Sequence, residues 1–231
     1  MSVITSLQQG NVQIIQWDDG KANAVSAQLL EELHAALDQA EQDKKAVVLV
    51  GRPGRFSAGF DLNVMGQGGD AMARLVVGGG KLALRMLSFP MPLVVACSGH
   101  ALAMGGLLLL SADYRMGVSG EFKIGLNEVA IGLTMPWFGV ELARGRLHPA
   151  HFNRAVTNAE MYSPDSSIAA GFLDQVVDGE KLMSEAIATA ENLMKLNLNA
   201  HHGTKLRVRE GLLAAVSNAI TLDFGPESLD W

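Results

Sequence analysis

The stretch "SGHALAMGGLLLLSADYR", residues 98–115, joins a glycine-rich loop directly to an apolar helix. It begins at the end of the run "LVVACSG" (93–99), whose aliphatic residues are typical of a strand covered on both faces. The part "GGLLLLSAD" (105–113) predicts a buried helix. Because the loop ends where the helix begins, free amides and the positive end of the helix dipole point at the same place.

A second loop of the same kind follows another buried strand. The aliphatic run "AVVLV" (46–50) leads into "GRPGRFSAGFDL" (51–62), where glycine and small residues leave room for backbone N–H groups to face outwards. On its own this loop could equally be an ordinary turn. Together, two such loops can aim two N–H groups at one oxygen, which is the geometry of an oxyanion hole.

Hydrophobic periodicity predicts an α/β protein in which strands and helices alternate before helices dominate. The runs "SVITSL" (2–7) and "NVQIIQW" (11–17) predict a β-hairpin, and Ser26 is the expected N-cap of a helix. Residues 63–70 are expected to form a polar loop. The other predicted elements are helices near 71–89, 137–145, 149–157, 164–170, 180–196 and 200–223 and short strands near 114–119, 121–125 and 174–177. We divide the chain into a core, 1–195, and a C-terminal helical region, 196–231.

Composition limits the classes of partner. The 231 residues are 48% hydrophobic, which favours an oligomer, and the net charge of −6 disfavours nucleic acid, which is bound mainly through Lys and Arg. The most apolar stretch is shorter than the roughly 20 residues of a membrane span, so no membrane partner is expected. Cys97 is the only cysteine, and the N-terminal residues lack a signal-peptide pattern, so we expect a reducing cytoplasm.

Other kinds of site have little support in the residues. "GGGK" (78–81) lies within a helical pattern and is not followed by Ser or Thr, unlike a phosphate-binding P-loop. Ser57 and Ser98 lack the G-x-S-x-G elbow of serine hydrolases. The adjacent pair His201 and His202 would diverge on a helix, so we expect no metal site.

The two loops resemble the oxyanion loops of the crotonase (enoyl-CoA hydratase/isomerase) superfamily. The resemblance extends from "GKANAVSAQLLEELHAAL" (20–37) to "SIAAGFLDQVV" (167–177), and "IGLNEVAIGLTMPWFGVELAR" (124–144) is most similar to the 3,2-enoyl-CoA isomerases. It implies a crotonase-type spiral of repeated strand-strand-helix units with a C-terminal helical trimerisation region. It also implies a homotrimer or dimer of trimers, an acyl-CoA substrate that brings coenzyme A as part of its thioester, and no tightly bound cofactor.

The resemblance assigns catalytic roles to particular positions. Its two oxyanion amides fall on Phe60 and on Met104, where most members have glycine. The two glutamates of the hydratases fall on Leu107 and Glu128, so this chain keeps only one. Hydration needs a water held between acid and base groups, whereas double-bond migration needs one group that removes and returns a proton. The pattern therefore favours an isomerase in which Glu128 carries the proton, with its pKa raised by burial.

Alternatives remain open at several of these positions. Without the resemblance, Glu128 would be interpreted as a carboxylate at a helix start or on the surface. The chain could instead catalyse hydration, hydrolysis or decarboxylation, or it could bind acyl-CoA without turnover. Asp113 and Arg115 are expected to form a structural ion pair or cap.

Two further sets of residues are assigned to the substrate. Aromatic residues expected to line the acyl tunnel are Phe60, Trp137 and Phe138, although core packing is the commoner role of such side chains. Cations that could meet the phosphates of coenzyme A are Lys21, Arg52, Arg55 and Lys205, although solvated surface charge is the commoner role of such side chains. The full set of residues that the resemblance assigns to binding of the CoA ester is Ala22, Ala24, Ala58, Phe60, Asp61, Leu62 and Lys205.

Overall fold

The computed structural model of the protein describes residues 2–226, and its centre is a six-stranded sheet. The strands lie in the order β1-β2-β4-β7-β9-β11, and all neighbours except the β1/β2 hairpin are parallel. Their bounds are β1 Ile4–Gln9, β2 Val12–Trp17, β4 Ala46–Val50, β7 Leu93–Cys97, β9 Tyr114–Val118 and β11 Gln175–Val177. The predicted hairpin and both continuous aliphatic strands are confirmed.

Two smaller sheets continue from the carboxyl ends of these central strands. One has the order β10-β8-β5, and the other pairs β3 with β6. Their bounds are β3 Ala24–Val25, β5 Gly54–Ser57, β6 Gly59–Phe60, β8 Gly99–Leu102 and β10 Ile124–Gly125. Each of β4, β7 and β9 is followed by such a short strand and then by a helix. This succession is the repeated strand-strand-helix unit that the sequence predicted.

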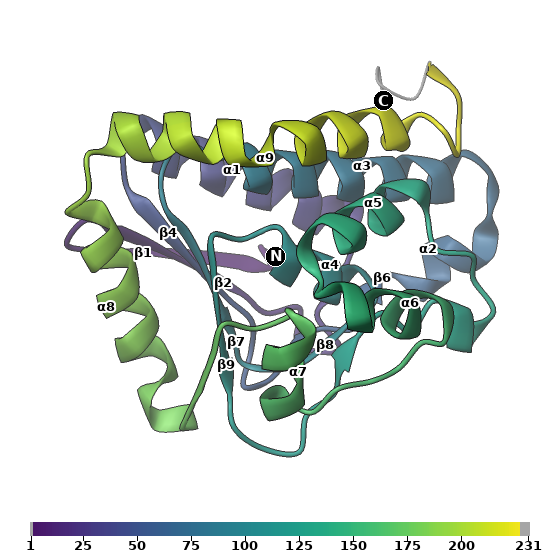
Figure 1. The fold of residues 1–231 in the computed structure, drawn as a ribbon, viewed down its shortest axis with the longest axis horizontal. Helices are drawn as coiled ribbons and strands as arrows, with labels where there is room; N and C mark the ends of the chain where they lie inside the picture. Colours follow the sequence, from purple (N-terminus) through teal and green to yellow (C-terminus); the bar gives the residue numbers. More distant parts are fainter. Residues whose placement is uncertain (1, 227–231) are drawn as a thin grey trace.

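Helices cover both faces of the central sheet. α8 packs on β4, β7 and β9 over one face, while α1, α3 and α4 contribute to the larger core on the other (Figure 1). Ser26 caps α1 as predicted, accepting a hydrogen bond from the Leu29 amide at 3.2 Å. The helix bounds are α1 Ala27–Gln42, α2 Leu62–Gln67, α3 Gly69–Ser88, α4 Met104–Leu110, α5 Trp137–Arg146, α6 Pro149–Thr157, α7 Pro164–Ala170, α8 Leu182–Met194 and α9 Leu198–Ile220, with single 3-10 turns η1 Val129–Ile131 and η2 Gly179–Lys181.

The prediction of a polar loop over residues 63–70 was wrong. Helix α2 occupies most of it because Asp61 caps the helix, accepting a hydrogen bond from the Asn63 amide at 2.9 Å. Gly68, with φ of 64°, then separates α2 from α3. A side-chain cap stabilises a short helix even where glycines lower its intrinsic propensity.

The C-terminal helix α9 lies along α3 and α5, and its residues Val216 and Ile220 belong to the main core (Figure 1). The division of the chain at residue 195 into a core and a C-terminal helical region therefore remains a prediction. Residues 227–231 of the C-terminal region lie outside the described residues. The trimer expected from the resemblance also remains a prediction.

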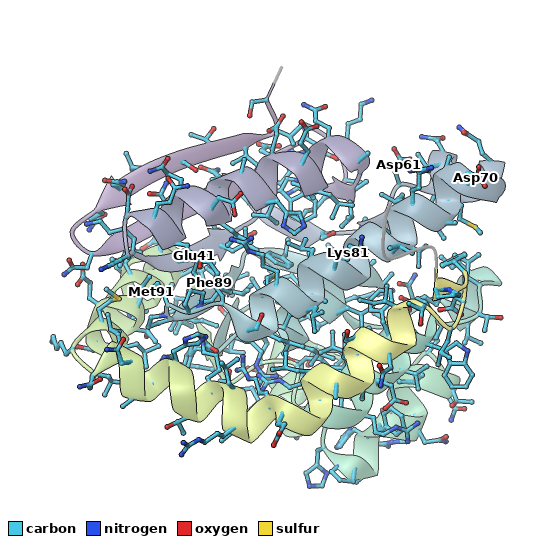
Figure 2. The ribbon with its side chains drawn as sticks, turned by 90° about the horizontal axis from the view of Figure 1, so that it is seen from above. Glu41, Asp61, Asp70, Lys81, Phe89 and Met91 are labelled. Atoms are coloured by element: carbon cyan, nitrogen blue, oxygen red, sulfur yellow. The ribbon has the colours of Figure 1, made fainter. Side chains whose placement is uncertain are left out.

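A buried ionic cluster anchors α9 at its first half. The Lys205 ammonium lies 2.6 Å from the Asp113 carboxylate and donates to the carbonyls of Phe89 and Met91, which lie just beyond α3 (Figure 2). Arg209 lies 2.9 Å from the other oxygen of Asp113. Asp113 and Arg115 both form structural ion pairs, as the sequence analysis expects, but they do not pair with each other. Arg115 pairs with Asp174 at 2.6 Å instead.

Candidate active site

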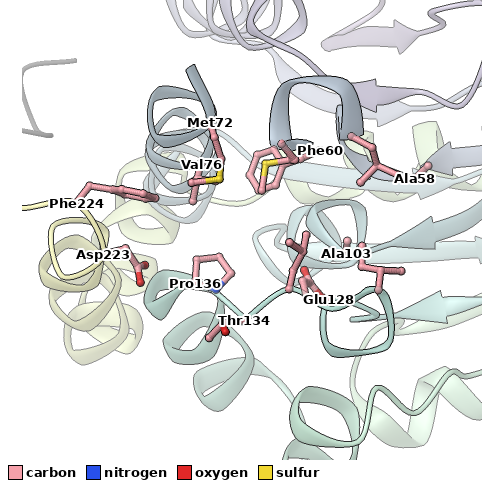
Figure 3. Close-up of a pocket in the computed structure, with 14 residues that line it drawn as sticks. Ala58, Phe60, Met72, Val76, Ala103, Glu128, Thr134, Pro136, Asp223 and Phe224 are labelled. Atoms are coloured by element: carbon pink, nitrogen blue, oxygen red, sulfur yellow. The ribbon is translucent and has the colours of Figure 1, made fainter. Parts of the chain in front are cut away.

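One apolar pocket lies where the two predicted loops meet the segment that carries Glu128 (Figure 3). Its volume is about 290 Å³. The two loops, α2, α3, the segment around η1 and the residues after α9 all contribute to its wall. The lining residues are Ala58, Phe60, Leu62, Met65, Met72, Val76, Ala103, Glu128, Ile131, Leu133, Thr134, Pro136, Asp223 and Phe224. Most of them present hydrocarbon, so the pocket suits an apolar chain.

Glu128 is the buried carboxylate of this pocket. Its side chain precedes η1 and is only 6% exposed. Its Oε2 atom has no hydrogen-bond partner among residues 2–226. Burial raises the pKa of Glu128 to about 7, against a smaller lowering by its own backbone amide. A carboxyl that has one oxygen without a hydrogen-bond partner and a pKa near neutrality can both accept and return a proton at physiological pH.

The two predicted oxyanion loops lie in contact. A Cβ atom on Gly59 would come within 2.7 Å of the Ala103 Cβ and 3.4 Å of the Met104 nitrogen. Gly59 also has φ of 92°, a conformation that side chains rarely adopt. Only glycine therefore lets the first loop approach the second this closely.

The second loop carries backbone strain at the start of α4. Ala103 has φ of 51° and ψ of −123°, a sparsely populated conformation for a residue with a side chain. Such strain persists only where the surroundings impose it, and it gathers at functional sites. The next residue, Met104, opens α4, and the first amides of a helix have no intrahelical acceptor. The strained turn thus presents an amide beside the pocket.

The Met104 side chain itself does not line the pocket. It is fully buried, and its methyl group lies near Gly79 of α3, together with the ring of Phe60. A Cβ on Gly79 would lie 2.5 Å from that ring and 3.2 Å from the Met104 methyl carbon. Because Gly79 has no side chain, there is room for the methionine at position 104, where the resemblance expects glycine.

Other residues predicted for the CoA ester lie around the first loop. Ala58 and Leu62 line the pocket, whereas Ala22, just before β3, and Ala24, in β3, support the first loop through their backbones. The Ala22 carbonyl accepts from the Ala58 amide at 3.2 Å, and Ala24 pairs with Gly59. The Asp61 carboxylate caps α2 and is not part of the pocket wall.

Three basic residues assigned to the phosphates of coenzyme A lie near the same loop through their backbones or side chains. Arg52 donates to the Lys21 carbonyl at 2.7 Å and lies 3.7 Å from the Asp18 carboxylate, which is itself exposed. Arg55 pairs with Arg52 through a backbone bridge. These contacts bring the backbones of Lys21 and Arg55 close to Arg52, and binding of a phosphate group by the three side chains stays a prediction.

The structure does not bring Lys205 to the pocket. Its side chain is 3% exposed. Its ammonium pairs with the Asp113 carboxylate and donates to the carbonyls of Phe89 and Met91, so we withdraw it from the candidate site. Of the aromatic residues predicted for the acyl tunnel, Phe60 lines the pocket, but Phe138 is buried in the core. Trp137 is 50% exposed and lines a neighbouring groove.

Several lining residues were missed by sequence reasoning. Met72 and Val76 belong to a helix that was predicted, but nothing in its pattern indicates which part faces a pocket. Asp223 and Phe224 come from the segment after α9, far along the chain from the loops. No motif marks them, because their role arises from where α9 ends.

Within residues 2–226, no helix is long and apolar enough to cross a membrane. The same residues contain no group of three or more His, Cys, Asp or Glu side chains arranged to hold a metal ion.

The fold and the paired loops define a member of the enoyl-CoA hydratase/isomerase family. The model of this family matches residues 8–224, so the chain belongs to it. Among solved structures, an enoyl-CoA hydratase/isomerase family protein from Pseudomonas syringae is 51% identical, with a TM-score of 0.94 and 96% of each chain covered.

Relatives of known name differ in the reaction they are named for. Human mitochondrial enoyl-CoA delta isomerase 1 is 30% identical over 91% of this chain and 70% of its own length. A putative enoyl-CoA hydratase from Thermus thermophilus is also 30% identical, over 92% of this chain and 84% of its own. The comparisons therefore establish the family, and the choice between the two reactions rests on the site.

Proposed function

We propose that this protein is an enoyl-CoA isomerase that moves a double bond along an acyl-CoA by proton transfer through Glu128. The observation that carries the proposal is the buried carboxyl of Glu128, whose Oε2 atom has no hydrogen-bond partner among residues 2–226, in an apolar pocket beside two touching loops. A relative named as an isomerase matches most of the chain, and an equally identical one is named as a hydratase, so the proposal rests on the site.

The reaction uses few groups of the protein. The thioester oxygen of a 3-enoyl-CoA lies against the amides of Phe60 and Met104, and the acyl tail lies along the apolar wall. The Glu128 carboxylate removes a proton from the α carbon. The electron pair of the broken C–H bond forms a double bond between the α carbon and the thioester carbon, and the π electrons of the carbonyl move onto the thioester oxygen. The amides stabilise this enolate charge. Protonated Glu128 then returns the proton to the γ carbon, so no atom is gained or lost.

The position of Leu107 argues against hydration. Leu107 is fully buried and is not part of the pocket wall, and its methyl group lies near Gly139. The pocket's other carboxylate, Asp223, lies at the end opposite Glu128 (Figure 3). Among the residues that the structure describes, the reacting end of this pocket therefore has no second carboxyl group that could hold a water molecule together with Glu128.

A single preparation distinguishes the candidate functions. Purified protein is given a 3-enoyl-CoA and, separately, a 2-enoyl-CoA, and double-bond migration and water addition are measured. Migration without comparable hydration supports the proposal. Hydration as the faster reaction would contradict it, and binding without turnover of either ester would favour a non-catalytic acyl-CoA-binding subunit.

The rate of isomerisation should depend on the ionisation of Glu128. Because the carboxylate form removes the proton, kcat/KM should rise about tenfold per pH unit below the pKa of about 7 and level off above it. An ordinary glutamate would already be ionised near pH 5. Initial rates between pH 5 and 9 test this, with circular dichroism confirming that the fold is retained. A flat profile over this range would contradict the role of Glu128.

Replacing Gly59 with Ala should reduce the rate by about 10²-fold, since misplacing one oxyanion donor costs about that much. The new methyl group meets Ala103 at 2.7 Å and φ is unfavourable for alanine, so the loops must separate. Gly66→Ala, a helical site with open space around it, is the matched control. Steady-state kinetics of both variants check the prediction, and equal rates for them would contradict it.

A further inference from the structure

We propose that Asp223 and Phe224, in the segment after α9, form the end wall of the acyl pocket and set the longest acyl tail that it accepts. The inference rests on the proposed function, because it takes this pocket as the site of the acyl tail. It adds a specificity role for two residues that take no part in proton transfer.

The two residues lie at the end of the pocket away from the reacting groups. Glu128 and Ala103 are at one side, and Asp223 and Phe224 are at the other, with Pro136 and Thr134 between them (Figure 3). Phe224 is partly buried and packs against the main hydrophobic core. A tail that runs from the thioester along the apolar wall therefore ends at these two side chains.

A hydrogen bond holds this end wall in place. Oδ2 of Asp223 accepts from the Trp137 amide at 2.9 Å. Trp137 is the first residue of α5. The N-cap residue of this helix, Pro136, makes no capping hydrogen bond through its side chain. Asp223 therefore acts as the cap of α5 from a distant part of the chain, and its negative charge is stabilised by the positive end of that helix.

A second apolar groove begins on the other side of Asp223. This groove includes Trp137 and Val140 and shares Leu133, Thr134 and Asp223 with the acyl pocket. A longer tail that enters this groove passes the three shared residues, and removing water from the Asp223 charge among them is costly. A short tail leaves that carboxylate hydrated and bonded to α5. The wall is thus both steric, through Phe224, and electrostatic, through Asp223.

Binding of saturated acyl-CoA esters tests the end wall separately from catalysis, because these esters cannot be isomerised. Affinities are measured by calorimetry for tails of four to sixteen carbons. For the wild type, affinity should rise by roughly fourfold per buried methylene up to a turning point and then stop rising. Phe224→Ala and Asp223→Ala should move the turning point to longer tails by two carbons or more.

Two further variants serve as controls. Asp223→Asn keeps an oxygen that can accept from the Trp137 amide but removes the charge, so its turning point should lie between those of the wild type and Asp223→Ala. Leu222→Ala removes an exposed side chain of the same segment that does not line the pocket, and it should change nothing. Thermal unfolding of each variant shows whether the fold is intact.

The outcomes separate the two proposals. Curves for Phe224→Ala and Asp223→Ala that superimpose on the wild-type curve overturn the end wall while leaving the isomerase proposal intact. A shift for Asp223→Asn as large as that for Asp223→Ala overturns the role of the hydrogen bond to α5. If no acyl-CoA binds, both the end wall and the proposed function are overturned.

Discussion

Replacing Glu128 with Gln should lower kcat for double-bond migration by about 10²–10⁴-fold, the usual contribution of general acid–base catalysis. Glutamine has nearly the same shape as glutamate, but its amide cannot take the α proton or return it to the γ carbon. Because the pocket wall is otherwise unchanged, affinity for a saturated acyl-CoA should stay close to that of the wild type. Steady-state rates on a 3-enoyl-CoA and equilibrium binding of the saturated ester measure the two effects separately.

Glu121→Gln is the matched control for this variant. Glu121 is exposed and lies outside the pocket wall, so the same chemical change there should leave the rate unaltered. If Glu128→Gln keeps the wild-type rate, the proton is carried by another group and the mechanism is wrong. If both the rate and the binding of the saturated ester are lost, Glu128 shapes the pocket, and the variant does not report on proton transfer alone.

Replacing Asp113 with Ala should lower the free energy of unfolding by about 3–5 kcal/mol, the typical cost of removing one partner from a buried ion pair. The Asp113 side chain is only 8% exposed and faces Lys205 at 2.6 Å and Arg209 at 2.9 Å. It also accepts from the Leu93 amide at 2.9 Å. Without it, two buried cations on α9 lose their counterion. Urea denaturation measures the change.

A surface ion pair and a double variant make this test specific. Asp178 lies 3.7 Å from Lys181, and both side chains are mostly exposed, so Asp178→Ala should change the free energy by less than about 1 kcal/mol. Adding Lys205→Met to Asp113→Ala should recover part of the lost stability, because one uncompensated buried charge is removed. Equal losses for Asp113→Ala and Asp178→Ala would show that the buried cluster does not anchor α9.

Sequence patterns determined most of the secondary structure of this protein, because helices and strands follow the spacing of hydrophobic residues along a short stretch of chain. Strand β4 coincides with the predicted run, Ala46–Val50, and α4 begins at the end of the predicted loop. The resemblance placed the two loops and Glu128 in a shared site, and the structure brings them together. The resemblance also assigned Lys205 to the substrate, and the structure does not support this assignment. Residue type and spacing could not reveal that the Lys205 ammonium pairs with the Asp113 carboxylate.

Only the tertiary structure decided the features that depend on residues far apart in the chain. Lys205 meets Asp113 across 92 positions, and Asp223 meets the amide of Trp137 across 86. The sequence by itself determined that the chain carries one glutamate at a candidate proton-transfer position. The burial of its carboxyl, the lack of a hydrogen-bond partner at Oε2 and the rise of its pKa to about 7 follow from how the pocket residues pack around it. Desolvation is a property of the assembled surroundings, and no single segment of the sequence contains it.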